Sequence, residues 1–482
     1  MTCVLVLGLA VLRLAAAPLA LHPENPHYFI YNGEPTVLIT SAEHYGAVLN
    51  ADFDYDLYLN TLHNDGMNYT RLFTGSYVEI PGSFGIGNNT LAPDTGRFLA
   101  PWKRVAEPGL YAGEKKFDLS QWNPDYFRRL RAFVARAQEL GILVEVTLFC
   151  STYQDAYWER NPFNPGNNIN DIPPDLQRKK SNTLKNGALT GFQKQLVQKI
   201  VTELNEFDNV FYEIQNEPWA DDPVRVMRTL RSLDPRPGEG DWFKWAERAS
   251  DAILEWQNVM ARTIVETEKS LPQQHLIAQN YTNFKHSIAH VDEQISIINF
   301  HYAWPQAVWM NMAWERPIGF DESGFAGSSD TTYLRQAWQF MLAGGALFNN
   351  LDYSFFVGAE AGSGDNDAPG GGSPRLRRQL AVLRKFIHSF DFIRMQPDHE
   401  AVVHAPGLQW QGISEPGKQY AVIFTGVGND WIKLDLSEGE YHYDFVSPFT
   451  GKVLKSGIEK FASRTRLMLP EFAHMVALRI KK

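Results

Sequence analysis

Short apolar runs alternate with longer amphipathic segments along most of this chain, and no other feature constrains the fold as strongly. Eight such runs lie between about residue 34 and residue 392, each followed by a helical or irregular segment. Parallel strands joined by crossover helices produce this pattern. The expected strands are 36–41, 67–73, 142–149, 209–215, 275–279, 295–300, 317–321 and 346–353. Eight strand–helix units predict an α/β fold, a (β/α)8 TIM barrel, rather than an open doubly wound sheet.

Some of the segments between the strands carry clear helix signals. One helix is expected to begin at Asn123-Pro124, a favourable N-cap and N1 pair, and to stop at Gly141. Another is expected over 241–268, where apolar residues recur every three or four positions. The tryptophans expected in the core because of their helical spacing are Trp242, Trp245, Trp256 and Trp338.

The pattern changes after about residue 392. Strand-like runs follow one another, separated by turn signals such as Glu415-Pro416-Gly417, which predicts a small all-β sandwich. The chain is therefore divided into a barrel, 21–392, and an accessory β-sandwich domain, 393–482. Packing against the barrel and binding a ligand are both open roles for this domain. Its expected strands include 420–425, 431–436, 441–445 and 475–480.

The N-terminus resembles a secretory signal. The apolar run 4–14 is interrupted only by Arg13 and is followed by small residues over 15–20. We therefore expect residues 1–20 to be a signal peptide and the protein to be secreted or periplasmic. No later stretch reaches the roughly 18 to 20 apolar residues that cross a bilayer, so no membrane span is expected. Cys3 would leave with the signal, and Cys150 would then have no disulfide partner.

Composition excludes some classes of partner. The 45 Lys and Arg residues against 55 Asp and Glu residues give a formal charge of −10, which argues against a nucleic-acid partner. Metal, phosphate and dinucleotide motifs are absent from the sequence, so no metal or cofactor is expected. Aromatic residues reach 13%, more than packing alone requires. The oligomeric state stays open.

Two carboxylates lie at the same end of the expected barrel. Asn216-Glu217-Pro218 follows the fourth strand, and Asp321-Glu322 ends the seventh. Catalytic groups of TIM barrels lie at the carboxyl ends of the strands. Cleavage of a glycosidic bond needs such a pair, because one acid protonates the leaving oxygen while a second carboxylate attacks or activates water.

These motifs resemble clan A glycoside hydrolases, near the family 5 cellulase-like enzymes. The resemblance covers roughly residues 22–392 and implies that Glu217 is the general acid/base and Glu322 the nucleophile. It also implies that Asn216 binds the substrate 2-hydroxyl. An ionised Glu322 would favour the protonated form of Glu217, as the acid role requires. A separation of about 5 to 5.5 Å between the two carboxyl groups would indicate a retaining mechanism.

The resemblance extends to the second and sixth strands. It places Arg71 beside the nucleophile, where it would keep Glu322 ionised, and His301 and Tyr302 at the end of strand six. Two positions depart from the family pattern. The histidine expected after strand three is replaced by the sequence 150–153, Cys-Ser-Thr-Tyr, and the tryptophan expected at strand eight by 350–353, Asn-Leu-Asp-Tyr. The sugar is therefore left open.

Several side chains keep alternative roles. Glu322 shares its site with Asp321, and either of them could be the structural partner of the other; the clan pattern favours Glu322 as the nucleophile. Glu213 and Glu145 lie within strands, where internal salt bridges explain them better than catalysis. Arg71 could serve only to neutralise such acids, and His301 could support a substrate-binding residue rather than touch substrate. Glu43 and His44, after strand one, bind sugar hydroxyls or cap the following loop.

Aromatic side chains at or beyond strand ends can stack on the apolar face of a sugar. The expected substrate-binding aromatics are Trp219, Trp304 and Tyr353, with Trp102, Tyr153 and Trp158 as further candidates. Together with the acid pair they predict a retaining hydrolase of β-linked oligo- or polysaccharides. A catalytically silent carbohydrate-binding barrel, and an exo-acting glycosidase for a sugar other than glucose, remain as alternatives.

Overall fold

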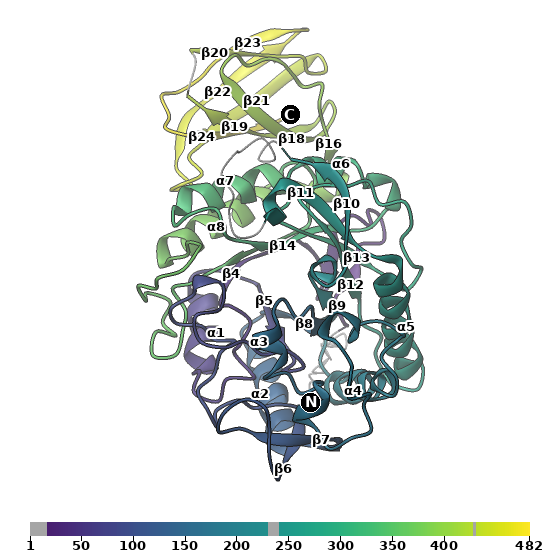
Figure 1. Cartoon of the computed structure of the whole chain (residues 1–482). Coiled ribbons are helices and arrows are strands. Elements are labelled where there is room, and N and C mark those ends of the chain that lie inside the picture. The colour runs from purple at the N-terminus through teal and green to yellow at the C-terminus, as the bar shows by residue number, and fades with distance from the viewer. Residues whose placement is uncertain (1–16, 230–240, 428–429) are drawn as a thin grey trace, which may run out of the picture.

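The computed structural model describes residues 17–229, 241–427 and 430–482. Its centre is a ring of parallel strands that follow one another in chain order (Figure 1). The last of them, β15, pairs with the first, β4. The ring is nearly closed, because β4 and β5 are the one neighbouring pair without a ladder in the described strands. The ring strands are β4 (Leu38–Ala42), β5 (Tyr69–Phe73), β8 (Leu143–Cys150), β9 (Val210–Asn216), β12 (Ile277–Asn283), β13 (Ile297–His301), β14 (Ile318–Ser323) and β15 (Leu347–Leu351).

All eight expected strands are confirmed, and the fold is a TIM barrel. Almost every residue of these strands is buried, because helices and loops cover the outside while side chains fill the inside. This explains why each strand is recognisable as a continuous apolar run. The helices are α1 (Tyr55–Asn64), α2 (Pro124–Glu139), α3 (Asp155–Trp158), α4 (Leu189–Leu204), α5 (Asp251–Glu268), α6 (Gln306–Trp309), α7 (Asp330–Met341) and α8 (Pro374–Ile387).

Helix α2 begins where its sequence signals predicted. The side chain of Asn123 accepts a hydrogen bond from the Asp125 N–H, and Pro124 occupies the first helical position, where its missing N–H costs nothing. The helix ends before Gly141, whose φ of 69° suits a glycine.

The helix expected over 241–268 is half wrong. Only α5, which begins at Asp251, is α-helical; residues 241–244 form a 3-10 turn, and β11 (Trp245–Ala249) pairs antiparallel with β10 (Pro223–Arg228). This hairpin is attached to the barrel through β11 and β12. Helical spacing in the sequence could not reveal that a partner strand supplies the backbone hydrogen bonds of 245–249.

The accessory domain is built from two antiparallel sheets, which Figure 1 shows packed above the barrel. Strand β19 alternates: Ala421 and Ile423 join the apolar core of the barrel, while Val422 and Phe424 belong to a second core between the sheets. The domain therefore packs firmly on the barrel. Its strands are β16 (Gln396–Pro397), β17 (Val402–His404), β18 (Leu408–Glu415), β19 (Gln419–Gly426), β20 (Trp431–Leu434), β21 (Gly439–Val446), β22 (Val453–Phe461), β23 (Thr465–Met468) and β24 (Met475–Lys481).

Smaller elements cover the bottom and side of the barrel. A sheet of β1 (Ala20–Leu21), β2 (Phe29–Tyr31) and β3 (Glu34–Thr36) precedes β4, and the hairpin of β6 (Trp102–Pro108) and β7 (Lys115–Trp122) lies between β5 and α2. Leu19 is buried, and its N–H donates to the carbonyl oxygen of Asp208 at 3.1 Å.

The predicted signal peptide falls largely on residues 1–16, outside the described residues, while its expected end at residue 20 lies in β1. Cys3 is also outside them, and Cys150 is buried as a free thiol. Among the described helices, none combines the length and apolar character needed to cross a membrane.

Candidate active site

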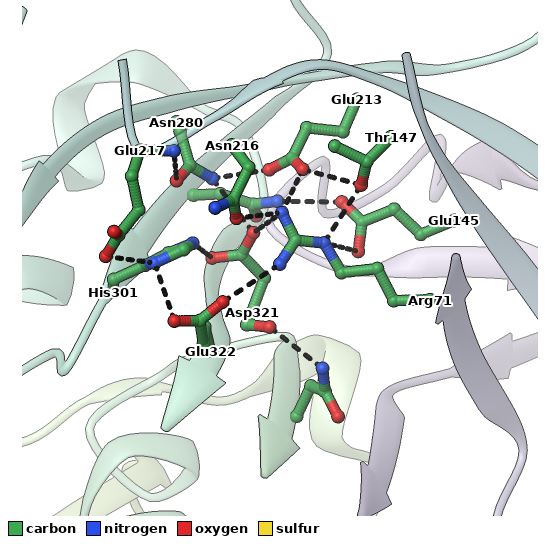
Figure 2. Close-up of polar contacts among 12 residues, drawn as sticks. Arg71, Glu145, Thr147, Glu213, Asn216, Glu217, Asn280, His301, Asp321 and Glu322 are labelled. Atoms are coloured by element: carbon green, nitrogen blue, oxygen red, sulfur yellow. Dashed lines mark hydrogen bonds and ion pairs between the residues drawn. The ribbon is translucent and has the colours of Figure 1, made fainter. Parts of the chain in front are cut away.

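A single arginine occupies the middle of the barrel and contacts carboxylates from three other strands (Figure 2). Arg71, on β5, is fully buried and forms an ion pair with Glu213 on β9. Its guanidinium also lies 3.7 Å from Glu145 on β8, and 3.5 Å from both Asp321 and Glu322 on β14. A buried charge is costly unless it is paired, so these strands depend on one another electrostatically.

The two acids within strands carry out the structural role predicted for them. Burial raises the pKa of Glu145 to about 7 against the opposing effect of Arg71. Burial likewise raises the pKa of Glu213 well above its ordinary value, again opposed by Arg71. Asn280 donates a hydrogen bond to each of Glu213 and Asp321, the latter at 2.9 Å, and extends the network to β12.

The structure separates Asp321 from Glu322. Asp321 has no exposed surface and lies between Arg71 and His301, whose Nε2 is 3.4 Å from its Oδ1. Glu322 instead lines a cavity. The pairing of β14 with β13 shifts by one residue between Phe320 and Glu322. Such a bulge re-aims a side chain, so two consecutive acids can both face the barrel interior.

Glu217 follows β9 in a left-handed backbone conformation, with φ of 46°. Ser151 donates a hydrogen bond to its carbonyl oxygen at 2.8 Å, and Asn280 accepts one from its N–H at 3.3 Å. Its side chain lies 3.0 Å from His301, between Oε1 and Nδ1. Pro218 begins the 3-10 turn that follows. Because the ring of a proline fixes φ, Pro218 helps to end the strand here.

His301 links both candidate catalytic acids. Its Nδ1, which contacts Glu217, also lies 3.4 Å from Glu322 Oε1. Burial lowers the pKa of His301, but the carboxylates of Glu322 and Asp321 outweigh it and raise the pKa well above its ordinary value. The three surrounding carboxylates, those of Glu217, Glu322 and Asp321, therefore favour the protonated form of the ring.

Glu322 is held ionised. Tyr302 donates a hydrogen bond to its Oε1 at 2.8 Å. Burial raises the pKa of Glu322, but His301, Arg71 and the Tyr302 hydroxyl together lower it by more than burial raises it. The net shift of the pKa is therefore downward. A carboxylate that stays charged at neutral pH can act as a nucleophile.

Strained backbone surrounds the two acids. Eleven non-glycine residues of the described chain have a positive φ, and six of them line the cavities around the acids. Such conformations cost roughly 1–3 kcal/mol each and persist only where the surrounding fold enforces them. The six residues are Tyr45, Phe84, Glu217, Phe284, Tyr302 and Phe325.

Three connected cavities open at this end of the barrel. Counting the open solvent at their mouths, they hold about 350, 1830 and 940 Å³, and we call them the inner, outer and side cavities. Glu322 lines only the inner cavity, whereas Glu217 lines both the inner and the outer one.

The predicted binding residues are distributed unevenly among these cavities. His44 and Asn216 line the inner cavity, Trp219 the outer one and Trp304 the side one, while Tyr302 lines all three. Arg71, His301 and Tyr353 lie behind the cavity walls, each no more than 4% exposed. Tyr353 packs against His44, with ring centroids 5.8 Å apart.

Other aromatic predictions need correction. Trp102 is 1% exposed and packs against Trp122 and Phe163, so it cannot stack on a sugar. Trp158 is also buried. Tyr153, in the departure after strand three, does line the inner and outer cavities, and its hydroxyl accepts a hydrogen bond from Asn216 at 2.9 Å.

All four tryptophans with helical spacing are predicted to lie in the core. Trp256 and Trp338 are fully buried there, but Trp242 and Trp245 are only partly buried. Trp242 lines the outer and side cavities and packs against Tyr302, with centroids 4.7 Å apart. Trp245 is half-buried beneath Arg225 and Arg228.

Sequence reasoning missed many cavity-lining residues in irregular loops and in the β10–β11 hairpin, where no periodic signal exists. Among them are Tyr77, Glu79, Phe84, Glu247 and Phe325.

Among the residues that the structure describes, two groups of side chains have the donor types and spacing of a metal site: Glu213, His301 and Asp321, and Glu217, His301 and Glu322. The guanidinium of Arg71 already neutralises acids in both groups. The carboxylates around His301, which both groups share, favour its protonated form, in which both ring nitrogens carry a hydrogen and cannot bind a metal. This donor set therefore fits a metal poorly, and hydrolysis by paired carboxylates needs none.

The model of the cellulase family, glycosyl hydrolase family 5, matches residues 44–330. The chain belongs to this family and is a glycoside hydrolase. No curated protein matches the sequence.

Solved structures show the same fold. A candidate glycoside hydrolase from Bacteroides vulgatus ATCC 8482 has a TM-score of 0.64 at 12% identity, over 97% of this chain and 82% of that one. A family 5 glycoside hydrolase from the same organism has a TM-score of 0.60 at 12% identity, over 96% and 93% of the two chains. At this identity the likeness establishes the architecture alone.

Replacing Arg71 tests whether the barrel depends on its central cation. Arg71→Met should lower the free energy of unfolding at pH 7 by about 3–5 kcal/mol, because it leaves buried carboxylates unpaired. Urea denaturation followed by tryptophan fluorescence measures this. Arg128→Met, which removes an exposed arginine from α2, should change stability by no more than about 0.5 kcal/mol. Equal effects of the two variants would contradict the role of the network.

Removing one hydroxyl tests what keeps Glu322 ionised. Tyr302→Phe should raise the pKa of Glu322 and move the acid limb of kcat/KM to higher pH, because a hydrogen bond to the charged form is lost. In the unaltered protein that limb should lie below the ordinary carboxyl range. Tyr126→Phe, which removes a buried hydroxyl on α2 that makes no hydrogen bond, should leave the profile in place. An unshifted limb in Tyr302→Phe would refute the assignment.

Proposed function

We propose that the protein is a retaining glycoside hydrolase that cleaves β-glycosidic bonds of an oligo- or polysaccharide, with Glu322 as nucleophile and Glu217 as general acid/base. The observation that carries this proposal is the spacing of the acids. One carboxylate oxygen of Glu217, one of Glu322 and a ring nitrogen of His301 all lie within 4.8 Å of one another. Retaining enzymes hold their carboxyl groups about 5–5.5 Å apart, whereas inverting enzymes leave roughly 6.5–9.5 Å for a water molecule.

The surroundings of the two acids support different roles. Glu322, paired with Arg71 and Tyr302, is charged and lies in the inner cavity, where the anomeric carbon of the bound sugar would be. Its oxygen would form a bond to that carbon as the bond to the leaving oxygen breaks. Glu217 lies at the boundary of the inner and outer cavities, where it can deliver a proton to the leaving oxygen.

Water then completes the reaction. Glu217, now ionised, would remove a proton from a water molecule that enters from the outer cavity, and the hydroxide would displace Glu322 from the anomeric carbon. His301 orients Glu217 through their 3.0 Å contact. Two displacements, each with inversion, restore the original configuration.

Asn216 fits the role that family 5 gives it. Its amide is fixed by Arg71, which donates to Oδ1 at 2.9 Å, and by Tyr153, which accepts from Nδ2 at 2.9 Å. The residue lines the inner cavity beside Glu322, as a ligand of the sugar 2-hydroxyl must. Membership of the family, together with these paired acids, favours catalysis over the silent binding barrel. A secreted or periplasmic location would suit a polysaccharide substrate.

Azide distinguishes the roles of the two acids. Glu322→Ala and Glu217→Ala should each lower kcat by at least about 10³-fold on an aryl β-glycoside. In Glu322→Ala, azide can occupy the vacated space and attack directly, so the glycosyl azide should have the inverted configuration. In Glu217→Ala, azide should intercept the glycosyl-enzyme and give the retained configuration, provided that the leaving group needs no protonation. NMR of the anomeric proton identifies each product.

The unaltered protein provides the second readout. Its first-formed sugar should keep the β configuration, and Glu139→Gln, an exposed change at the end of α2, should behave identically. A first product with inverted anomeric configuration would contradict the proposal. So would identical azide products from the two alanine variants.

A further inference from the structure

The inner cavity is the one that Glu322 lines, and it adjoins the outer cavity at Glu217. The two cavities share Phe84, Tyr153, Glu217, Tyr302 and Phe325, so these residues form the passage between them. The sugar attacked by Glu322 must lie in the inner cavity, and the leaving group must lie in the outer one.

The inner cavity has a closed far wall. Tyr45, Tyr77, Glu79 and Leu91 line it, and none is more than 2% exposed, so solvent does not reach them from behind. The wall is made by two loops, the one after β4 and the long one between β5 and β6. A polysaccharide chain therefore has no way out of the inner cavity through this wall.

These two loops are packed backbone against backbone. A Cβ atom at Gly46 would lie 2.2 Å from the carbonyl oxygen of Thr90, closer than any side chain allows. Thr90 and the backbone N–H groups of Gly46 and Ala47 all donate to the buried carboxylate of Glu43. Glu43 thus ties the two loops together, which is the capping role considered for it.

Polar groups converge on this closed end. Glu79 is fixed by the Tyr77 hydroxyl, at 3.1 Å from Oε1, and by the Asn89 amide, at 2.6 Å from Oε2. His44 Nε2 lies 3.5 Å from Glu79 Oε2. His44 is 8% exposed; its Nδ1 has no hydrogen-bond partner, and its Nε2 has only the long contact to Glu79. Buried polar groups are rarely left unsatisfied, so this arrangement points to a ligand.

Sugar hydroxyls complete this arrangement. Each hydroxyl can donate to a carboxylate and accept from an imidazole N–H, and adjacent hydroxyls on one ring present two such groups side by side. The aromatic rings of Tyr45, Phe73 and Phe84 supply apolar surface for the sugar between these polar groups and the acid pair.

We propose that Glu79 and His44 bind free hydroxyls of the terminal, non-reducing sugar, and that the enzyme is therefore exo-acting, releasing one monosaccharide at a time. This inference rests on the proposed function, because it requires that Glu322 attack the sugar in the inner cavity. It adds that the closed wall accepts a sugar only if no further unit is attached to its far side.

Product length tests the proposal without any variant. β-Linked gluco-, manno-, xylo- and galacto-oligosaccharides, fluorescently labelled at the reducing end, would be digested and analysed by chromatography. We expect each labelled chain of the preferred sugar to shorten by one unit at a time, with only monosaccharide released. O-methylation of the non-reducing terminal sugar should abolish cleavage. Early release of internal fragments of mixed length would overturn the proposal.

Glu79→Gln tests the residue itself. The change keeps the shape but loses the charge, and kcat/KM for the matching aryl β-monosaccharide should fall about 10–100-fold for each hydroxyl bound. The same comparison is then made on sugars that each lack one ring hydroxyl. The fall in kcat/KM caused by Glu79→Gln should be smaller on the deoxy sugar that lacks the hydroxyl bound by Glu79. A merely structural role would lower activity on all substrates equally. Glu107→Gln, an exposed change on β6, should have no effect.

His44→Gln provides a second variant if Glu79→Gln fails to fold, and it should show the same selective loss. Mass spectrometry after treatment with 2-deoxy-2-fluoro aryl glycosides separates the two proposals. A fluoroglycosyl group attached to Glu322 in an enzyme that cuts internally would overturn exo action alone. Absence of both the adduct and any hydrolysis would overturn the proposed function, and exo action with it.

Discussion

The structure depends on one buried cation. Arg71 lies at the centre of the barrel and neutralises acids contributed by β8, β9 and β14. Three of its partners, Glu145, Glu213 and Asp321, are completely buried. Charges in such surroundings are costly unless paired, and removing one partner leaves the others uncompensated. The network therefore makes the strands interdependent and defines the position of the carboxylate that faces the cavity. Glu322, the proposed nucleophile, also contacts this network. The network therefore sets the orientation of its carboxylate and helps to keep it charged.

Local strain accompanies this arrangement. Glu217 and Tyr302 both have left-handed backbone conformations, and β14 contains a bulge between Phe320 and Glu322. Each feature directs a side chain from a strand end into the cavity, where regular strand geometry would have turned it away. The cost is borne by a large barrel core and by the second core between the two sheets of the accessory domain. Stability gained over the whole chain thus supports unfavourable geometry at one end of the barrel.

The aromatic surplus has two destinations. Trp102, Trp256 and Trp338 are fully buried and pack within the core. Others, including Tyr153 and Trp242, surround the acid pair and provide flat apolar surface beside a few polar groups, a combination suited to sugars. Composition alone could not separate these groups, since helical spacing assigned Trp242 to the core and a loop position assigned Trp102 to the site. In both cases the neighbours brought by folding decided the outcome.

Sequence alone determined the barrel, the strand order and the two glutamates at the ends of strands four and seven. Buried parallel strands are continuous apolar runs, and the carboxyl ends of such strands gather at one face of the barrel. Short stretches of sequence are therefore enough to predict these features. Tertiary structure decided the rest. The hairpin at 245–249 required a partner strand, and the separation of Asp321 from Glu322 required a bulge. The closed end formed by His44 and Glu79 required two loops to meet at Gly46. These depend on contacts between residues far apart in the chain, for which no local pattern exists.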